Sequence, residues 1–141
     1  MTTRKAARAL DTARACGVLL RLHLLFRLRG STAVARRTAA AMRVEASSQA
    51  MLDARRVDAW HTARAVWRAN RLLPLHSTCL QVALAMHDLF ERKGCHAVVR
   101  VGVRDPGAAA HAWVEIGDFV LDDQRLSTNF LPFEPGAEVP L

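Results

Sequence analysis

Residues 78–103 read TCLQVALAMHDLFERKGCHAVVRVGV, and the spacing of their apolar residues changes at Gly94. Before Gly94 the apolar residues follow the helical period and cover most of the circumference, which predicts a buried central helix. Thr78 and Gln81 form a capping-box pattern at its start, which makes Cys79 the first helical residue. After Gly94 the apolar residues alternate with a period of two, which predicts a strand. The change from helix to strand predicts an α+β fold.

Three further helices are predicted before residue 78. The first spans residues 2–28, and Gly30 ends it. Its apolar residues recur at steps of three and four, which places them on one helix face: Leu10, Ala13, Gly17, Leu20, Leu24 and Leu28. The second spans residues 33–51 and the third residues 57–70. The third carries a stripe that we expect to be core, made of Trp60, Ala63 and Trp67.

After the strand that ends at Val103, the sequence predicts an antiparallel hairpin. Its strands cover residues 110–116 and residues 119 to 122 or 123, and Gly117-Asp118 forms a two-residue turn between them. The tail from Phe130 contains three prolines, which predicts an irregular segment that wraps the domain or a disordered end. Helices followed by a small antiparallel sheet fit the α+β class.

The basic residues are concentrated in one half of the chain. Residues 1–71 contain 15 Lys and Arg against 4 Asp and Glu, whereas residues 72–141 contain 5 against 9. The chain is expected to comprise a basic helical extension, residues 1–56, and a core domain, residues 57–141. The extension is a candidate docking surface for an acidic peptide, a partner protein or nucleic acid, and a solvated arginine-rich surface is the alternative interpretation.

Composition also bounds the location of the protein. The chain has 141 residues, of which 51% are hydrophobic, so it is long enough to bury a core. Its apolar runs are short and interrupted by charges, so neither a transmembrane helix nor a secretory signal is expected. Three cysteines do not form a disulfide framework, which indicates a reducing, cytoplasmic location.

Cys79, His111 and an aspartate at 122 or 123 fall on three different predicted elements. A helix N-terminus favours the thiolate of Cys79, which is the nucleophile that acyl transfer requires. His111 is a candidate general base and acid, and a neighbouring carboxylate would orient its imidazole. The backbone N–H of Cys79 is a candidate oxyanion donor, and Ser77 is a candidate for a second donor.

The length of the hairpin turn decides which aspartate lies on the histidine face. A two-residue turn pairs Ile116 with Phe119, which puts Asp122 on the same face as His111 and Asp123 on the opposite face. A one-residue bulge or a three-residue turn would instead put Asp123 on the face of His111 and Asp122 on the opposite face.

The same residues resemble those of the transglutaminase-like cysteine peptidases. The resemblance rests on Cys79-Leu80, Gly94, Val101-Gly102-Val103, the segment His111-Ala112-Trp113-Val114-Glu115, and Val120-Leu121-Asp122-Asp123, and it covers about residues 57–131. More narrowly, the chain resembles the leader peptidase of lasso-peptide biosynthesis. The resemblance implies a papain-like core and a triad of Cys79, His111 and Asp123, with Asp122 as the alternative.

The resemblance also implies a substrate and partners. The substrate would be a ribosomally made precursor peptide that is cut between leader and core. A small leader-binding protein and an ATP-using lasso cyclase would be the partners, with no role for nucleic acid or membrane. The residues themselves leave two alternatives open: acyl transfer to an amine instead of water, and an inactive module whose basic helices bind a partner or nucleic acid.

No cofactor is expected from the sequence. There is no glycine-rich phosphate loop, so ATP binding by this chain is not predicted. The candidate ligands for a metal ion are His76, Cys79, Cys95, His96 and His111, and their spacing matches none of the common zinc patterns. Cys95 and Cys16 are interpreted as packing residues.

Overall fold

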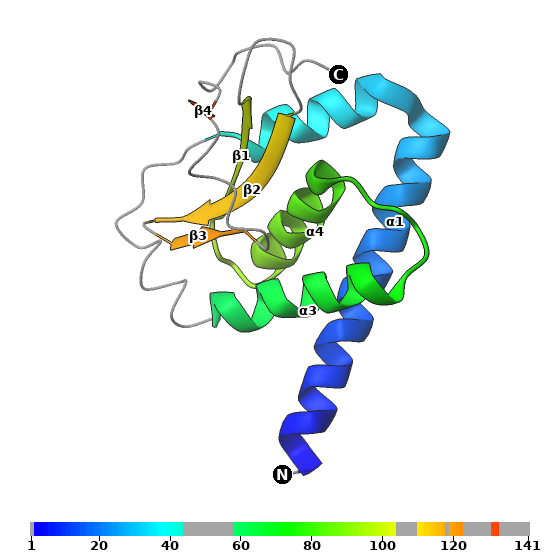
Figure 1. Cartoon of the computed structure of the whole chain (residues 1–141), viewed down its shortest axis with the longest axis vertical. Helices are drawn as coiled ribbons and strands as arrows, with labels where there is room; N and C mark the ends of the chain where they lie inside the picture. The colour runs from blue at the N-terminus through cyan, green and yellow to red at the C-terminus, as the bar shows by residue number, and fades with distance from the viewer. Residues whose placement is uncertain (1, 44–57, 104–109, 118, 123–130, 133–141) are drawn as a thin grey trace.

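The computed structural model describes residues 2–43, 58–103, 110–117, 119–122 and 131–132. Its helices are α1 (Thr2–Ala41), α3 (Ala59–Leu72) and α4 (Cys79–Arg92), and its strands are β1 (Val98–Val103), β2 (Ala110–Ile116), β3 (Phe119–Leu121) and β4 (Leu131–Pro132). Helix α4 lies in the middle, with the sheet on one side and α1 and α3 around its other sides (Figure 1). The predicted α+β arrangement is therefore confirmed.

The strands form one antiparallel sheet with the order β3-β2-β1-β4. The predicted hairpin is present, because Ile116 pairs directly with Phe119 across a two-residue turn. The prediction of an irregular tail is wrong at residues 131–132, which pair with β1. A proline is compatible with this position because β4 is an edge strand, where a missing N–H costs no internal ladder bond.

Helix α4 is buried over much of its surface, as its apolar residues predict. Leu84, Met86 and Phe90 are almost inaccessible to solvent. The apolar residues of α1, α3, α4 and the inner face of the sheet join in one core cluster. From α1 the cluster receives Ala15, Val18, Leu19, Leu22 and Ala41, and Met42, directly after the helix, joins them. The proposed domain boundary between residues 56 and 57 lies outside the described residues.

Helix α1 has apolar side chains on two opposite faces. The face made by Val18, Leu19 and Leu22 is buried in the core. The stripe that repeats at steps of three and four faces outward, and its leucines are 41–83% exposed: Leu10 52%, Leu20 41%, Leu24 56% and Leu28 83%. Within this helix Gly30 has φ 74° and ψ −167°, so the predicted break occurs there as a kink. The helices of the described part include none that is long and apolar enough to span a membrane.

The tryptophan stripe of α3 is only partly core. Ala63 is fully buried and Trp67 packs against the core cluster. Trp60 is 42% exposed, so the prediction is wrong for this residue. Its ring packs edge-on against Trp67 at a centroid distance of 6.4 Å. One helical period does not distinguish the centre of a buried face from its rim.

Candidate active site

Cys79 is held at the first position of α4 by the predicted capping box. The Thr78 side chain accepts a hydrogen bond from the Gln81 backbone N–H at 3.2 Å, and the Gln81 side chain accepts one from the Thr78 N–H at 3.0 Å. As the first helical residue, Cys79 has a backbone N–H with no acceptor inside the helix. Its thiol is exposed and lies 4.0 Å from the carbonyl oxygen of Ala110, which precedes His111 on β2. The positive end of the α4 dipole therefore faces the start of β2.

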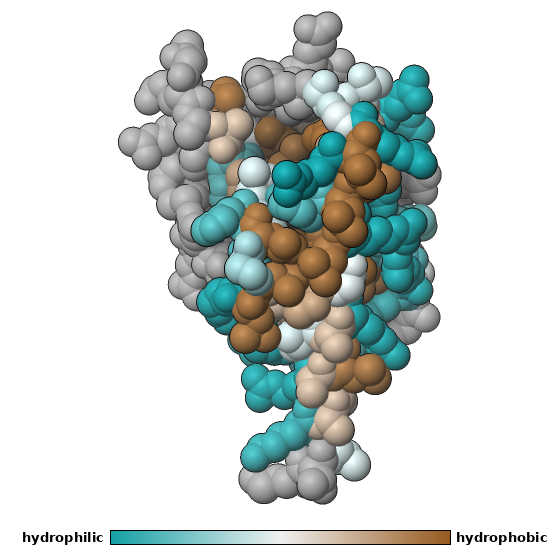
Figure 2. Space-filling model, turned by 90° about the vertical axis from the view of Figure 1, so that its right-hand side faces the viewer, coloured by the Kyte–Doolittle hydropathy of each residue, from teal (hydrophilic) through white to brown (hydrophobic). Residues whose placement is uncertain are grey.

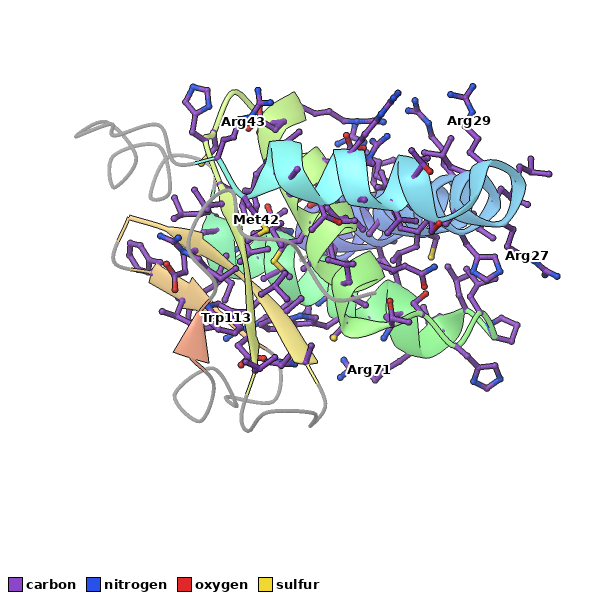
Figure 3. The ribbon with its side chains drawn as sticks, turned by 90° about the horizontal axis from the view of Figure 1, so that it is seen from above. Arg27, Arg29, Met42, Arg43, Arg71 and Trp113 are labelled. Carbon is purple, nitrogen blue, oxygen red and sulfur yellow. The ribbon has the colours of Figure 1, made fainter. Side chains whose placement is uncertain are left out.

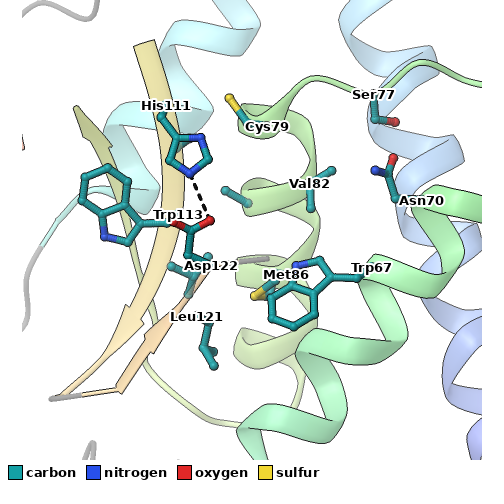
Figure 4. Close-up of a pocket in the computed structure, with 13 residues that line it drawn as sticks. Trp67, Asn70, Ser77, Cys79, Val82, Met86, His111, Trp113, Leu121 and Asp122 are labelled. Atoms are coloured by element: carbon teal, nitrogen blue, oxygen red, sulfur yellow. Dashed lines mark hydrogen bonds and ion pairs between the residues drawn. The ribbon is translucent and has the colours of Figure 1, made fainter. Parts of the chain in front are cut away.

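His111 and Asp122 form a buried hydrogen-bonded pair on the sheet. The Nε2 atom of His111 lies 3.0 Å from Oδ1 of Asp122, and their side chains are only 11% and 5% exposed. In Figure 4 the imidazole lies between Asp122 and Cys79, with Nε2 toward the carboxylate and the other ring nitrogen, Nδ1, on the side of the sulfur. An Nε2–H donated to the carboxylate leaves Nδ1 as the basic nitrogen, which is the tautomer needed to accept a proton from the thiol.

The hairpin register explains why Asp122 contacts His111. Because Ile116 pairs with Phe119 and Val114 with Leu121, the next residue, Asp122, falls opposite Trp113 and on the face of His111. The described hairpin contains neither the bulge nor the three-residue turn that would shift this register. Asp123 lies outside the described residues.

Trp113 stacks beside His111 and is itself held by a polar chain. The two rings lie 5.9 Å apart with an interplanar angle of 25°. The Trp113 Nε1–H donates to Oε1 of Glu115 at 2.9 Å, and the Arg100 Nε–H donates to Oε2 of the same carboxylate at 3.1 Å. The Glu115 carboxylate, which Arg100 holds in place, thus fixes the indole that stacks on the imidazole.

A small cavity of about 140 Å³ opens beside these residues. It is lined by residues of α3, α4 and the hairpin: Trp67, Asn70, Ser77, Cys79, Val82, Ala83, Met86, His111, Ala112, Trp113, Val114, Leu121 and Asp122. Its volume is close to that of an engineered cavity of about 150 Å³ that binds benzene, so it has room for one side chain. The apolar side chains of Val82, Met86 and Trp67 lie below the cysteine and the histidine (Figure 4).

Sequence reasoning missed Asn70 and Trp67 as cavity residues. Asn70 is the twelfth residue of α3 and carries no local pattern that marks it as functional. It reaches the site because α3 packs against α4, and it lies near Ser77 on the other side of the first turn of α4 from His111 (Figure 4). The candidate oxyanion residue Ser77 also lines the cavity. Only the tertiary packing brings these polar side chains together.

The two other cysteines are less exposed than Cys79. Cys95 is buried, and Cys16 is partly buried on α1. Over the described ranges, no three His, Cys, Asp or Glu side chains are grouped so that they could hold a metal ion. The arrangement at Cys79 therefore offers a nucleophile, a proton carrier and an orienting carboxylate, which are the groups used in covalent acyl chemistry.

Comparison with known proteins gives one match. A family model described as the transglutaminase-like superfamily matches residues 16–134. No curated protein and no solved structure matches the chain.

Proposed function

Because the chain belongs to the transglutaminase-like superfamily, we propose that it is a cysteine peptidase that removes the leader from a lasso-peptide precursor. The observation that carries the proposal is the position of Cys79 at a capped helix N-terminus, facing His111 and its carboxylate partner Asp122. Asp122 takes the role of the third residue because the hairpin register directs it to the histidine.

The first half of the reaction forms a thioester. Nδ1 of His111 accepts the thiol proton, and the Cys79 sulfur attacks the carbonyl carbon of the scissile peptide bond. The oxygen that becomes negative is stabilised by the Cys79 backbone N–H at the positive end of α4. The imidazolium then gives its proton to the departing amine nitrogen, so the C–N bond breaks and a C–S bond remains.

The second half returns the enzyme to its starting state. His111 removes a proton from a water molecule, whose oxygen attacks the thioester carbonyl. The C–S bond breaks and the product leaves as a carboxylic acid, while the sulfur, which departs as thiolate, takes back a proton from the imidazolium. Asp122 stabilises the imidazolium in both halves by accepting its Nε2–H.

The small size of the cavity argues that a partner protein, as well as the cavity itself, selects the bond that is cut. A cavity of about 140 Å³ lined by Val82, Met86 and Trp67 fits one apolar side chain beside the scissile bond. One side chain does not distinguish a single bond in a precursor from many others. A leader-binding protein that holds the precursor would raise the effective concentration of that bond.

Intact-mass spectrometry tests the proposal. A lasso-type precursor is incubated with the leader-binding protein and with the wild type, Cys79→Ala or Cys16→Ala. We expect cleavage at one leader–core bond by the wild type and by Cys16→Ala, and none by Cys79→Ala. Equal cleavage by all three would remove Cys79 from the mechanism.

The product mass also separates hydrolysis from acyl transfer. Hydrolysis gives a leader fragment that ends in a carboxylic acid, whereas transfer gives the mass of an added amine. A leader fragment that carries an amine would replace the peptidase proposal with an acyltransferase.

A further inference from the structure

The outer face of α1 is an apolar seam that no other described element covers. Its residues between Leu10 and Leu24 repeat with alternating steps of three and four, as in the a and d positions of a coiled coil: Leu10, Ala13, Gly17, Leu20 and Leu24. Leu28 extends the seam by one turn and is 83% exposed. Figure 2 faces this side of the molecule and shows apolar side chains in a band with hydrophilic side chains on both sides. A band of this kind is typical of an interaction surface.

The middle of the seam is shaped to receive a side chain. Along the seam, the small residues Ala13 and Gly17 lie between the larger side chains of Leu10 and Leu20. The helix surface therefore has a depression at Gly17. A Cβ atom added at Gly17 would meet nothing within 4 Å, so the space above it is open. In helix pairs, a side chain of one helix enters such a depression in the other.

Positive charge borders the seam on both sides. Arg14 and Arg21 lie on one flank, about two helical turns apart, and both are exposed. On the other flank a groove between α1 and α3 is lined by Lys5, Arg8, Thr12 and Arg68, together with Ala9, Ala13, Cys16 and Leu72. The groove and the seam are continuous because they share Ala13.

Among the residues that the structure describes, no carboxylate forms an ion pair with Arg68. Its Nε–H donates to the Thr12 hydroxyl at 3.2 Å, but its buried Nη2 atom has no hydrogen-bond partner in the described part of the chain. Burial lowers the pKa of Arg68, and the nearby Arg8 and Arg71 lower it further. Asp11 acts against this lowering of the pKa of Arg68, but its carboxylate also contacts His61 at 2.7 Å and Arg14 at 3.6 Å. An incoming carboxylate would therefore find an excess of positive charge.

We propose that this seam and its basic flanks bind an amphipathic helix of a partner protein, one with an apolar face bordered by Asp and Glu on both sides. A second copy of this chain would fit poorly, because antiparallel pairing of two seams would bring Arg14 of one copy toward Arg21 of the other. An acidic helix instead supplies large apolar side chains for the depression at Gly17 and carboxylates for Arg14, Arg21 and Arg68.

The seam lies away from the candidate active site, so the inference does not depend on the peptidase proposal. The first half of α1 lies on the opposite side of α4 from the sheet (Figure 1). Seen from above, Arg27 and Arg29 of α1 project at one end of the molecule and Trp113 lies toward the other (Figure 3). A helix docked on the seam leaves the cavity at Cys79 open to substrate.

Two synthetic peptides of about three heptads test the proposal. Both carry leucines at the a and d positions; one has Glu at the flanking positions and the other has Lys. Fluorescence anisotropy of the labelled peptides with the full chain gives the dissociation constants. We expect the Glu peptide to bind at least about tenfold more tightly than the Lys peptide, with the difference shrinking as salt is added. Equal affinity of the two peptides overturns the proposed charge selection.

Variants of the chain locate the binding surface. Leu24→Asp and the double variant Arg14→Glu, Arg21→Glu should each weaken binding of the Glu peptide by about tenfold or more. Arg43→Glu, an exposed arginine beyond the kink, and Val120→Asp, an exposed apolar residue on β3, should bind as the wild type does. Circular dichroism verifies that each variant folds.

Two further results would overturn the proposal in favour of another occupant. One is self-association of the wild type in sedimentation velocity that Leu24→Asp abolishes. The other is binding to phosphatidylglycerol vesicles, lost in Leu24→Asp, with no affinity for the Glu peptide.

Discussion

The pairing of Asp122 with His111 makes a prediction that distinguishes the two adjacent aspartates. Asp122→Asn keeps the size of the side chain but removes its charge. An asparagine amide that donates to Nε2 places the ring proton on Nδ1, the nitrogen on the side of Cys79. The imidazole then no longer accepts the thiol proton, and the imidazolium loses its anionic partner.

The magnitude follows from the contact. A hydrogen bond to a charged group contributes about 1.5–3 kcal/mol, and each ~1.4 kcal/mol corresponds to a factor of about ten. The hydrogen bond between His111 and Asp122 is 3.0 Å long and nearly buried, so we expect its loss to cost an energy within this range. Asp122→Asn should lower the rate of reaction at Cys79 by about 10- to 150-fold.

Alkylation by iodoacetamide measures this effect without a peptide substrate, because only the thiolate reacts. The rate at Cys79 is followed at about pH 6 by peptide mass spectrometry, with Cys16 as an internal reference. Asp123→Asn is the matched control, and if Asp122 is the residue that orients the imidazole, this variant should react within about threefold of the wild type. An unchanged rate in Asp122→Asn, or a larger loss in Asp123→Asn, would refute the assignment of Asp122.

Three further predictions concern stability. Thr78→Ala removes the cap of α4 and should lower the free energy of unfolding by about 1 kcal/mol in urea titrations. Thr78→Ser keeps a capping hydroxyl and should retain most of the wild-type stability. Equal stability of the two variants would contradict the capping argument. Glu115→Ala leaves the buried Nε1–H of Trp113 without its acceptor and should lower the free energy of unfolding by about 1–3 kcal/mol. Glu91→Ala, at a more exposed carboxylate, should lower it by less than about 1 kcal/mol. Similar losses in the two variants would argue against the contribution of the Trp113 contact. Burial lowers the pKa of His87, against the raising influence of Glu91, so the unfolded chain binds the proton more tightly. The free energy of unfolding should therefore fall as the pH decreases below 6.5, and it should fall less in His87→Gln; parallel pH profiles would contradict this assignment.

The local parts of the fold follow closely from the sequence. The capping box at Thr78, the change of period at Gly94 and the two-residue turn at Gly117 are each decided by a few neighbouring residues, and the structure has all three. Hairpin geometry alone favoured Asp122 for the face of His111, because residues alternate strictly along a strand. The family pattern favoured Asp123, which lies outside the described residues.

The remaining features depend on packing between distant segments. Helical spacing identified the stripe from Leu10 to Leu28 but does not show which face of a helix with two apolar sides is buried. Val18, Leu19 and Leu22 form the buried face because α3 and α4 pack there. Asn70 enters the site for the same kind of reason, since its position depends on how α3 crosses α4.

The placement of Cys79 on α4 has a consequence for how the protein moves. Amide hydrogen exchange is slowest in segments that open only when the whole domain unfolds. We expect α4 to be such a segment because its side chains Phe90, Leu84 and Met86 are buried in the core. Cys79 is therefore attached to the element that opens last. The opposite wall of the cavity ends in β3, a strand of three residues at the edge of the sheet. Adjustment to a bound peptide should accordingly occur on the side of His111 and Asp122, while the sulfur keeps its position.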